Sequence, residues 1–355
     1  MAENNATILI PDISGFTEFM TTTELSHSSH AINLLIDAML EAVGEEYEVS
    51  EIEGDAVLLI KKGPAPSQKE IMNTCLKIFN GFHFQRKFLE LNAVCPCGAC
   101  QAIIDLTLKF VVHHGPLAEI KVGRFVKQSG TEMIVAHRLL KNSINNDEYL
   151  LLTEKLFNDE ADPSGVVDME WIRSADEYAS IGKVDYRFTL LNEARKNVPD
   201  PPAPQYNYPA ADMSYMEMTI AANYIDVYMM LMDIPSRPQW VPGLQKVEQD
   251  RPEVFVGSIH RCTFSTYSAV VTPLKMTILE DGILFAESCR IEERDLSLVY
   301  EFVFKKMDEN SCSFMARLIN AGETPVHEKV QHALFEEMQE MGESLKKHCE
   351  KKEVS

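Results

Sequence analysis

Two aspartates stand beside strongly apolar runs near the start of the chain. Asp12 comes just after the apolar run 6–10, and Asp55 directly precedes the apolar run 56–60. Such runs predict buried strands, which would place both carboxylates at strand ends or in adjoining turns. Two carboxylates on adjacent strand ends can share divalent cations, and a metal pair can activate and clamp a phosphoryl group. The pattern therefore predicts a Mg²⁺ or Mn²⁺ site, unless both aspartates only end their strands, as Asp often does in turns.

A second set of potential metal ligands is the cysteine cluster of Cys95, Cys97 and Cys100. Three thiolates at this spacing could hold zinc if a fourth ligand were supplied, and His83 and His114 are the candidates for it. Structural zinc sites usually show two separated ligand pairs, however, and the sequence shows no second pair. A plain loop or a redox-reactive loop explains the cluster as well as zinc does.

The composition is that of a soluble globular protein with two domains. The chain of 355 residues is too long for one ordinary domain, and 45% of its residues are hydrophobic. A net charge of −21 argues against nucleic acid or an anionic membrane surface as a partner. We find no signal peptide and no apolar stretch long enough to span a bilayer. We therefore expect a cytoplasmic protein whose eight cysteines are reduced.

A proline-dense segment at 198–209 divides the chain, because it can form neither a helix nor a central strand. We predict a first domain at 1–195, a linker at 196–212 and a second domain at 213–355. The elements predicted in the first domain are a strand at 6–10, a helix at 27–43, strands at 46–52 and 56–61, a helix at 66–91, a strand at 106–113, a short helix at 135–142 and a strand at 182–191. Their order predicts a ferredoxin-like α/β sandwich with its helices on one face of the sheet.

The second domain contains several short predicted strands and one long amphipathic helix. The strands are predicted at 215–220, 245–249, 258–265, 276–279, 284–291, 298–305 and 311–320, and the helices at 222–232 and 326–349. The inward face of the long helix is expected to consist of Val330, Leu334, Met338, Met341 and Leu345, and its solvated face to include Glu336, Glu340, Glu343 and Lys347. A curved antiparallel sheet that grips this helix buries both apolar faces, so the fold class of the chain is α+β.

Several segments of the first domain resemble class III nucleotide cyclases, which convert a purine nucleoside triphosphate into the cyclic monophosphate. The likeness covers most of residues 1–193 and is carried by Asp-Ile-Ser-Gly-Phe-Thr at 12–17, Gly-Asp at 54–55, His-His-Gly at 113–115 and the helix entry at 130–139. It implies that Asp12 and Asp55 bind divalent cations and that Phe16 and Thr17 belong to the nucleotide-binding segment. It also implies that Arg138 stabilises charge developing on the phosphate, and that the protein is a homodimer, because class III sites form between two such domains.

Some positions depart from the cyclase pattern. Ile134 stands where the family carries the Asn that orients the ribose, and it has no polar atom to offer. Glu51 and Lys127 stand where adenylate cyclases carry a base-selecting Lys and its partner Asp. A carboxylate accepts from guanine N1–H and the exocyclic amine, and Lys donates to guanine O6, so the pair favours guanine over adenine. The alternative is that Glu51 and Lys127 form a salt bridge across an unused pocket.

The second domain resembles the START-like, helix-grip superfamily, which includes polyketide cyclases and lipid carriers. The likeness spans 213–350 and is carried by the segment 234–244 and by the terminal helix. It implies an apolar cavity between sheet and helix that holds a hydrophobic small molecule, with Trp240 near one end and its N–H paired. Four polar residues predicted on strands either face this cavity or are solvated or satisfied core groups: His260, Tyr267, Glu287 and Tyr300.

The sequence therefore predicts a divergent cyclase-like domain, weakly active or inactive, that binds a metal–nucleotide, followed by a domain that binds a hydrophobic ligand. Two alternatives remain. One is an active purine nucleotide cyclase that prefers GTP, and the other is a non-catalytic scaffold or a lipid- or polyketide-binding protein.

Overall fold

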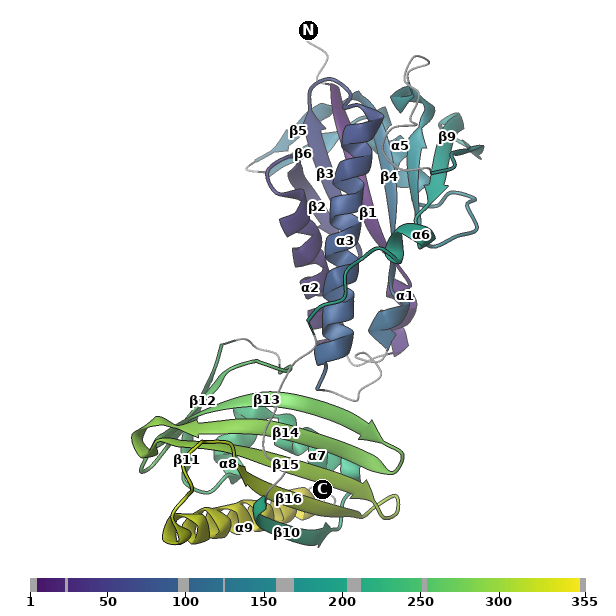
Figure 1. Ribbon diagram of the computed structural model, residues 1–355. Coiled ribbons are helices and arrows are strands. Elements are labelled where there is room, and N and C mark those ends of the chain that lie inside the picture. The colour runs from purple at the N-terminus through teal and green to yellow at the C-terminus, as the bar shows by residue number, and fades with distance from the viewer. Residues whose placement is uncertain are drawn as a thin grey trace. The chain divides into compact units, whose positions relative to one another are not determined.

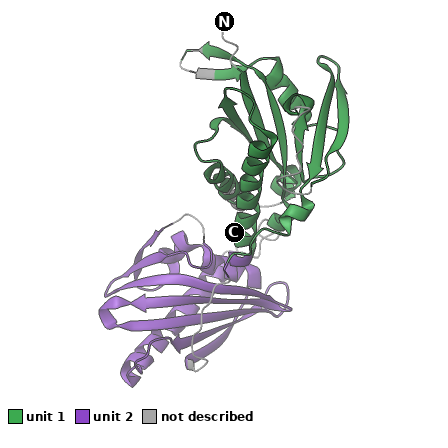
Figure 2. Ribbon diagram, turned by 45° about the horizontal axis from the view of Figure 1, so that its top comes forward, with its two compact units in different colours: residues 1–90, 97–201 green, residues 91–96, 202–355 purple. Residues whose placement is uncertain are grey.

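The computed structural model describes residues 5–22, 25–94, 102–123, 125–157, 169–202, 212–250 and 254–351. The chain forms two compact units, one made of Met1–Glu90 and Cys97–Pro201 and the other of Leu91–Pro96 and Pro202–Ser355 (Figure 2). Each unit combines a large sheet with helices, so the expected α+β class is confirmed. The short segment Leu91–Pro96 is an unexpected part of the second unit, in which the Tyr228 hydroxyl donates a hydrogen bond to the Val94 carbonyl.

The first unit is built on a seven-stranded sheet of order β2-β3-β1-β4-β7-β9-β8. Its strands are β1 (Asn5–Ser14), β2 (Glu48–Glu53), β3 (Ala56–Lys62), β4 (Thr107–Pro116), β7 (Tyr149–Thr153), β8 (Ile172–Tyr178) and β9 (Gly182–Leu190), and a separate hairpin consists of β5 (Ala118–Val122) and β6 (Phe125–Ser129). Neighbouring strands of the sheet are antiparallel, except that β4 and β7 are parallel. The four strands β2-β3-β1-β4 have the expected ferredoxin-like order.

Helices cover both faces of this sheet. On one face, α2 (Leu25–Val43) and α3 (Gln68–Asn92) pack against a cluster that includes Leu9 (Figure 1). On the other face, α5 (Thr131–Leu139) packs against Ile8 and Ile10. The expectation that the helices share one face is therefore wrong. The reason lies in β1, where Ile8 and Leu9 point to opposite faces and are both 0% exposed, so that each face needs a cover.

The second unit is a seven-stranded antiparallel sheet of order β10-β16-β15-β14-β13-β12-β11. Its strands are β10 (Asp212–Ile220), β11 (Leu244–Gln249), β12 (His260–Phe264), β13 (Ser268–Leu279), β14 (Gly282–Ile291), β15 (Leu296–Lys306) and β16 (Cys312–Asn320). The helices α7 (Tyr224–Met232), α8 (Arg237–Trp240) and α9 (Glu328–Lys351) lie on one side of the curved sheet (Figure 1). This is the expected helix-grip arrangement.

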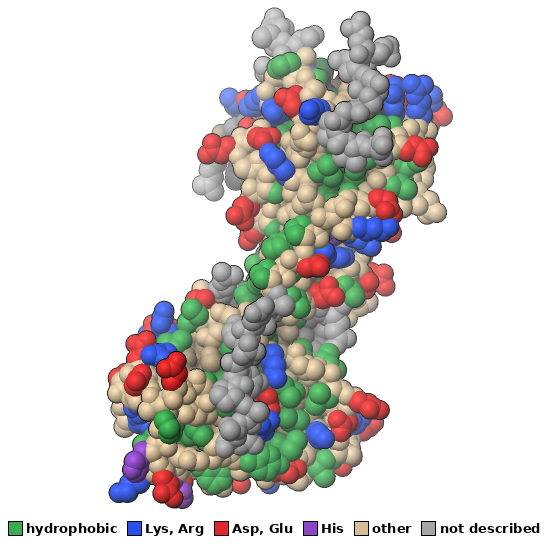
Figure 3. All heavy atoms as spheres, in the orientation of Figure 1, with side chains coloured by type: hydrophobic (Ala, Val, Ile, Leu, Met, Phe, Trp, Pro, Cys, Tyr) green, Lys and Arg blue, Asp and Glu red, His purple; other side chains and the backbone are tan. Residues whose placement is uncertain are grey.

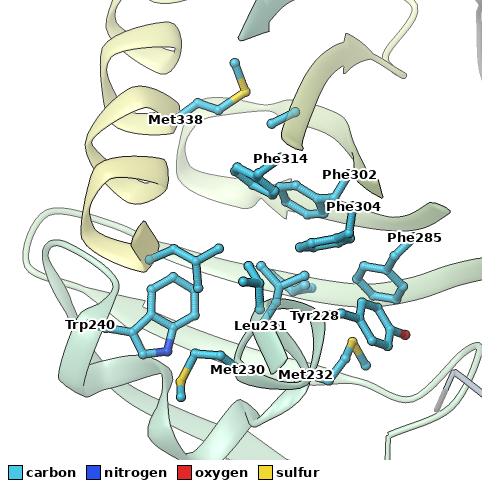
Figure 4. Close-up of a cluster of buried hydrophobic side chains, with 14 of the residues drawn as sticks. Tyr228, Met230, Leu231, Met232, Trp240, Phe285, Phe302, Phe304, Phe314 and Met338 are labelled. Carbon is cyan, nitrogen blue, oxygen red and sulfur yellow. The ribbon is translucent and has the colours of Figure 1, made fainter. Parts of the chain in front are cut away.

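An aromatic-rich core joins the second sheet to α7 and α9. The ring of Tyr228 lies 5.9 Å from that of Phe285 and 5.5 Å from that of Phe304 between centroids (Figure 4). The expected inward face of α9 is confirmed, with three buried and two partly buried residues: Leu334, Met338 and Leu345, and Val330 and Met341. The residues expected in solvent are exposed: Glu336, Glu340, Glu343 and Lys347. α9 also passes close to β10, where a Cβ on Gly342 would lie 2.4 Å from Met216 Cε, so the Met216 side chain occupies the space beside this glycine.

The described surface carries charges of both signs. On the face seen in Figure 3, acidic side chains are interspersed with Lys and Arg on both units. Within the described ranges, no helix is both long and apolar enough to cross a membrane.

Candidate functional sites

Asp12 and Asp55 lie together beside the turn between β2 and β3. Asp12 is opposite Ala56 in the pairing of β1 with β3, and the N–H of Ile13 donates to the carbonyl of Asp55 at 3.1 Å. This pairing brings the two carboxyl groups within hydrogen-bonding reach of each other. The predicted proximity of the two aspartates is confirmed, and a metal ion bound between them remains a prediction.

A third charged group, Lys109, belongs to the same cluster. Lys109 is opposite Asp12 in the pairing of β1 with β4, and its Nζ lies 3.2 Å from Asp12 Oδ2. Burial raises the pKa of Asp12 to about 6, while Lys109 acts in the opposite direction and Asp55 adds to the rise. Lys109 is not among the residues predicted above. Its strand is visible in the sequence, but its partner depends on strand register, which one sequence does not reveal.

Two carboxylates suit a divalent cation that keeps other ligands as well. Mg²⁺ is commonly held by one or two carboxylates together with substrate phosphates and water. Among the described residues, no group of three or more His, Cys, Asp or Glu side chains could hold a metal. Asp12 and Asp55 therefore fit a cation that arrives with a phosphate-bearing ligand and competes with Lys109 for Asp12.

Phe16 and Thr17 open the short helix α1 (Phe16–Thr22) beside the same turn. The Phe16 ring lies against Gly54, where an added Cβ would be 3.7 Å from the nearest ring atom. Gly54 has a φ of 67°, a conformation that favours glycine, and it precedes Asp55 in the turn. Thr17 is exposed. The fold thus brings the two predicted motifs to one place, and their binding of a nucleotide remains a prediction.

Glu51 and Lys127 form an ion pair between β2 and β6, with Lys127 Nζ 2.9 Å from Glu51 Oε2. The hydrogen bond to Glu51 is the main cause that raises the pKa of Lys127. This is the salt bridge foreseen as an alternative to base recognition. Both side chains keep exposed area, 24% for Glu51 and 63% for Lys127, so the pair is accessible to a ligand, and its preference for guanine remains a prediction.

Ile134 and Arg138 lie on α5, and both are exposed. Ile134 is 53% exposed, which leaves its position open to solvent. Arg138 is within electrostatic range of Tyr178 on β8. Among the described residues, no hydrogen bond or ion pair joins Arg138 to Asp12 or Asp55. Its catalytic role remains a prediction.

A buried polar cluster accounts for the His-His-Gly segment. Glu132, in the first turn of α5, hydrogen-bonds to Nε2 of His113 and accepts a hydrogen bond from Lys155 Nζ at 2.7 Å. The other ring nitrogen of His113, Nδ1, lies 2.8 Å from Thr153 Oγ1 on β7. A Cβ on Gly115 would lie 2.7 Å from Glu132 Cγ, so only glycine leaves room for the carboxylate. The segment therefore ties β4, α5 and β7 together.

The predicted zinc ligands lie outside the described residues: Cys95, Cys97 and Cys100. Both candidates for a fourth ligand have partners of their own. His83 Nε2 is within ion-pair distance of Glu148, at 2.8 Å, and His114 Nδ1 lies 2.9 Å from Thr7 Oγ1. Zinc binding remains a prediction, and these contacts favour structural roles for the two histidines.

The second unit contains a cavity of about 270 Å³ between its sheet and α9. Apolar side chains from α7, β13 and β15 line it, among them Leu231, Val271 and Phe302. The cavity lies where the resemblance to START-like proteins implies one, and a molecule bound in it remains a prediction.

A buried ion pair forms part of the cavity wall. Arg237 on α8 donates from Nη2 to Glu287 Oε2 at 3.0 Å and from Nη1 to Oε1 at 3.3 Å, and its Nε donates to the Leu231 carbonyl at 2.9 Å. Arg237 and Glu287 are each 6% exposed. Arg237 was not predicted, although it lies in the segment 234–244 that carries the START-like resemblance. Its charge in a segment that is otherwise largely apolar was the available signal.

Three of the four polar residues predicted near the cavity line it: Tyr267, Glu287 and Tyr300. The fourth, His260, is not part of the lining. It is 0% exposed, its Nε2 lies 3.3 Å from Ser258 Oγ, and burial lowers its pKa to about 4. His260 is therefore a core residue.

Trp240 lines the cavity as expected, but the expectation that its N–H is paired is wrong. Its Nε1 is buried and has no hydrogen-bond partner among the described residues. Figure 4 shows the reason, because the nitrogen side of the ring faces Met230, whose thioether is a weak acceptor.

Comparisons with known proteins match parts of the chain to uncharacterised sequences and to solved structures. A family described as a protein of unknown function (DUF2652) matches residues 32–149. An uncharacterised protein of Mycobacterium tuberculosis, Rv2561/Rv2562, is 30% identical over 120 residues, which make up 34% of this chain and 56% of that protein. The chain thus spans about half the length of this relative.

Two of the solved structures that match are a nucleotide cyclase and a START superfamily protein. The adenylyl cyclase CyaB from P. aeruginosa is 14% identical with a TM-score of 0.37, over 53% of this chain and 94% of that one. A START superfamily protein from Mycobacterium smegmatis is 12% identical with a TM-score of 0.32, over 39% of this chain and 97% of that one. The chain is similar to a nucleotide cyclase and to a START superfamily protein over different shares of its length.

Proposed function

We propose that the second unit binds a hydrophobic small molecule. The cavity of about 270 Å³ carries this proposal, because well-packed cores contain few voids larger than a water molecule. Ligand pockets commonly measure ~300–1,000 Å³, so the volume suits a small ligand. Apolar walls with a few polar groups are the usual lining of such pockets.

The buried pair of Arg237 and Glu287 supports a binding role. Removing two charges from water can cost as much free energy as their mutual attraction contributes. A buried ion pair is therefore weak evidence that the pair stabilises the fold. A unit that served only as a scaffold would fill this space with apolar side chains. A charged pair that borders a cavity instead provides a ligand with polar contacts beside apolar surface.

A co-purified compound and a dye test this proposal. Mass spectrometry of the denatured full-length protein should detect a hydrophobic molecule, and the neutral dye Nile red should bind the ligand-free protein. Val271→Phe, which fills the cavity from β13, should abolish both signals. Val299→Ile enlarges a side chain in a separate buried cluster and should preserve both. Unfolding temperatures identify folded variants. The absence of both signals from folded wild-type protein would contradict the proposal and favour a scaffold.

We further infer that the first unit binds a purine nucleotide with Mg²⁺ or Mn²⁺ and turns it over slowly or not at all. The adjacent carboxyl groups of Asp12 and Asp55 favour binding of a metal-bound phosphate. Ile134 offers no hydrogen bond where the cyclase resemblance implies an Asn, and the loss of one positioning donor lowers a rate ~10²–10³-fold. The alternative, an active cyclase that prefers GTP, would use Arg138.

Calorimetry with GTP and with ATP in Mn²⁺ tests this second proposal. We expect binding that Asp55→Asn removes, together with little cyclic nucleotide. Rapid cyclic-nucleotide formation that Asp12→Ala abolishes would favour the active cyclase. If neither GTP nor ATP bound, both the weakly active and the active cyclase hypotheses would be excluded, and the first unit would be left with a structural role. Sedimentation of the same samples tests the predicted homodimer.

A further inference from the structure

Among the described residues that line the cavity of the second unit, acidic residues outnumber basic ones. The cation among them is Arg237, and the carboxylates are Glu287, Glu337 and Glu340. This inference rests on the proposed ligand-binding function of the same cavity. We infer that the ligand is a hydrophobic amine, an apolar body that carries a protonated amine or a quaternary ammonium group.

The charge of Arg237 is already paired. Three of its five N–H groups donate hydrogen bonds, one to the Leu231 carbonyl and two to the oxygens of Glu287. Glu287 balances its charge at 3.0 Å, with both residues buried. A fatty acid or other carboxylate would therefore enter a cavity where Arg237, the cation among the described lining residues, is already paired, and it would approach two further carboxylates.

Those two carboxylates lie on the part of α9 that borders the cavity. Glu337 and Glu340 of α9 are three residues apart, so they are neighbours on the helix surface, and both are exposed. The Tyr267 hydroxyl donates to Glu337 Oε2 at 3.2 Å, which orients that carboxylate and leaves its other oxygen for a cation. An ammonium group can therefore stay partly hydrated beside α9 while its apolar body enters between the sheet and the helix.

One aromatic ring in the wall also favours a cation. It is not Tyr267, because Phe264 is stacked on that ring at 4.6 Å and the Arg294 guanidinium lies 4.4 Å from its centroid. Tyr300 lines the cavity as well, and its ring is stacked with Phe302 at 6.0 Å between centroids. The Tyr300 hydroxyl has no hydrogen-bond partner among the described residues. Rings beside carboxylates are the surroundings in which proteins recognise ammonium groups.

A matched series of eight-carbon probes tests the inference on the full-length chain. The probes are octyltrimethylammonium, 1-octanol and octanoate, each titrated by calorimetry at pH 7 below its micelle-forming concentration. We expect the ammonium probe to bind on the order of tenfold more tightly than octanol, and octanoate to bind most weakly. In the double variant Glu337→Gln with Glu340→Gln, the ammonium advantage should disappear while octanol binds as before.

The control is Glu336→Gln with Glu343→Gln, which removes the same charge from exposed positions of α9 that do not line the cavity. It should keep the ammonium preference. An equal loss in the control would show that the general negative charge of the protein attracts the probe, and would overturn the inference. Octanoate binding as tightly as the ammonium probe would also overturn it, while leaving the proposed hydrophobic site intact. If none of the three probes bound, the inference and the proposed site would both fail.

Discussion

Lys109 faces Asp12 across the pairing of β1 with β4, with its Nζ 3.2 Å from the Asp12 carboxylate. Their side chains are 20% and 10% exposed, so water screens this attraction only partly. Asp55 lies within hydrogen-bonding reach of Asp12, so two carboxylates are neighbours here. The ammonium group of Lys109 balances the charge of one of them. A metal-bound phosphate that approached Asp12 would therefore meet a cation that belongs to the protein.

Lys109→Met should destabilise the protein at neutral pH and make its stability depend on divalent cations. Breaking a buried pair costs ~3–5 kcal/mol, and partial exposure reduces the expected loss here to about 2 kcal/mol. Mn²⁺ should stabilise the variant more than the wild type, because it can supply the missing positive charge. Urea unfolding with and without Mn²⁺ measures both effects.

Lys183→Met is the matched control for this change. Lys183 pairs with Asp185 at 2.6 Å, but the two side chains are 66% and 55% exposed. Exposed pairs contribute about 0–1 kcal/mol, so the control should lose little stability. Equal losses in the two variants would show that Lys109 does not balance the aspartates.

The ion pair of Glu51 and Lys127 predicts a preference for GTP over ATP, if the first unit binds nucleotide. Glu51 can accept from the donors of guanine but would meet an acceptor on adenine. The double variant Glu51→Lys with Lys127→Asp reverses the pair, which keeps opposite charges together, and it should shift the preference towards ATP. Calorimetry with both nucleotides measures the change. Equal wild-type affinities for GTP and ATP would show that neither side chain reads the base.

Local periodicity predicted much of this fold. The inward residues of α9 follow from helical spacing alone, and the proximity of Asp12 to Asp55 follows from a short hairpin beside a central strand. The length of β13 was not predicted, since only a short strand, at 276–279, was expected there. In the structure β13 spans Ser268–Leu279, and the irregular register between Pro273 and Lys275 accommodates the proline.

The polar contacts of both sites were harder to predict. Lys109 reaches Asp12, and Arg237 reaches Glu287, through pairings between segments that lie far apart in the sequence. Such pairings depend on strand register and on the packing of helices against sheets, which local patterns do not encode. The position of α5 on the second face of the sheet depends on the same kind of contact.

The buried imidazole of His260 should make the protein less stable as the pH falls from about 6.5 to 4. Burial, with Arg237 adding to it, lowers the pKa of His260 from 6.5 to about 4. Between these values the unfolded chain binds a proton that the folded chain does not. The neutral His260 therefore costs no stability above pH 6.5. As the pH falls from 6.5 through 4, the free energy of unfolding decreases, by up to ~3 kcal/mol for a pKa shift of about 2.5 units.

His260→Gln should therefore lose less stability between pH 7 and pH 4 than the wild type does, as measured by urea unfolding across that range. His332→Gln, at a histidine whose side chain is 74% exposed, should keep the pH dependence of the wild type. If His260→Gln shows the same pH dependence as the wild type, the imidazole is not the group responsible.

The pair of Arg237 and Glu287 should be far more sensitive to the loss of one partner than to the loss of both. Arg237→Met leaves the Glu287 carboxylate buried without its counter-charge, and such a change costs ~3–5 kcal/mol. Arg237→Met with Glu287→Leu removes both charges and should recover most of that loss, because apolar side chains of similar size can replace a buried ion pair. Urea unfolding of the two variants and of Glu287→Leu completes the cycle.

A double variant that is no more stable than Arg237→Met would show that the loss comes from the hydrogen bond between Arg237 and the Leu231 carbonyl, rather than from the unpaired charge. Recovery of stability together with loss of ligand binding would instead show that the pair is kept for its contacts to the ligand.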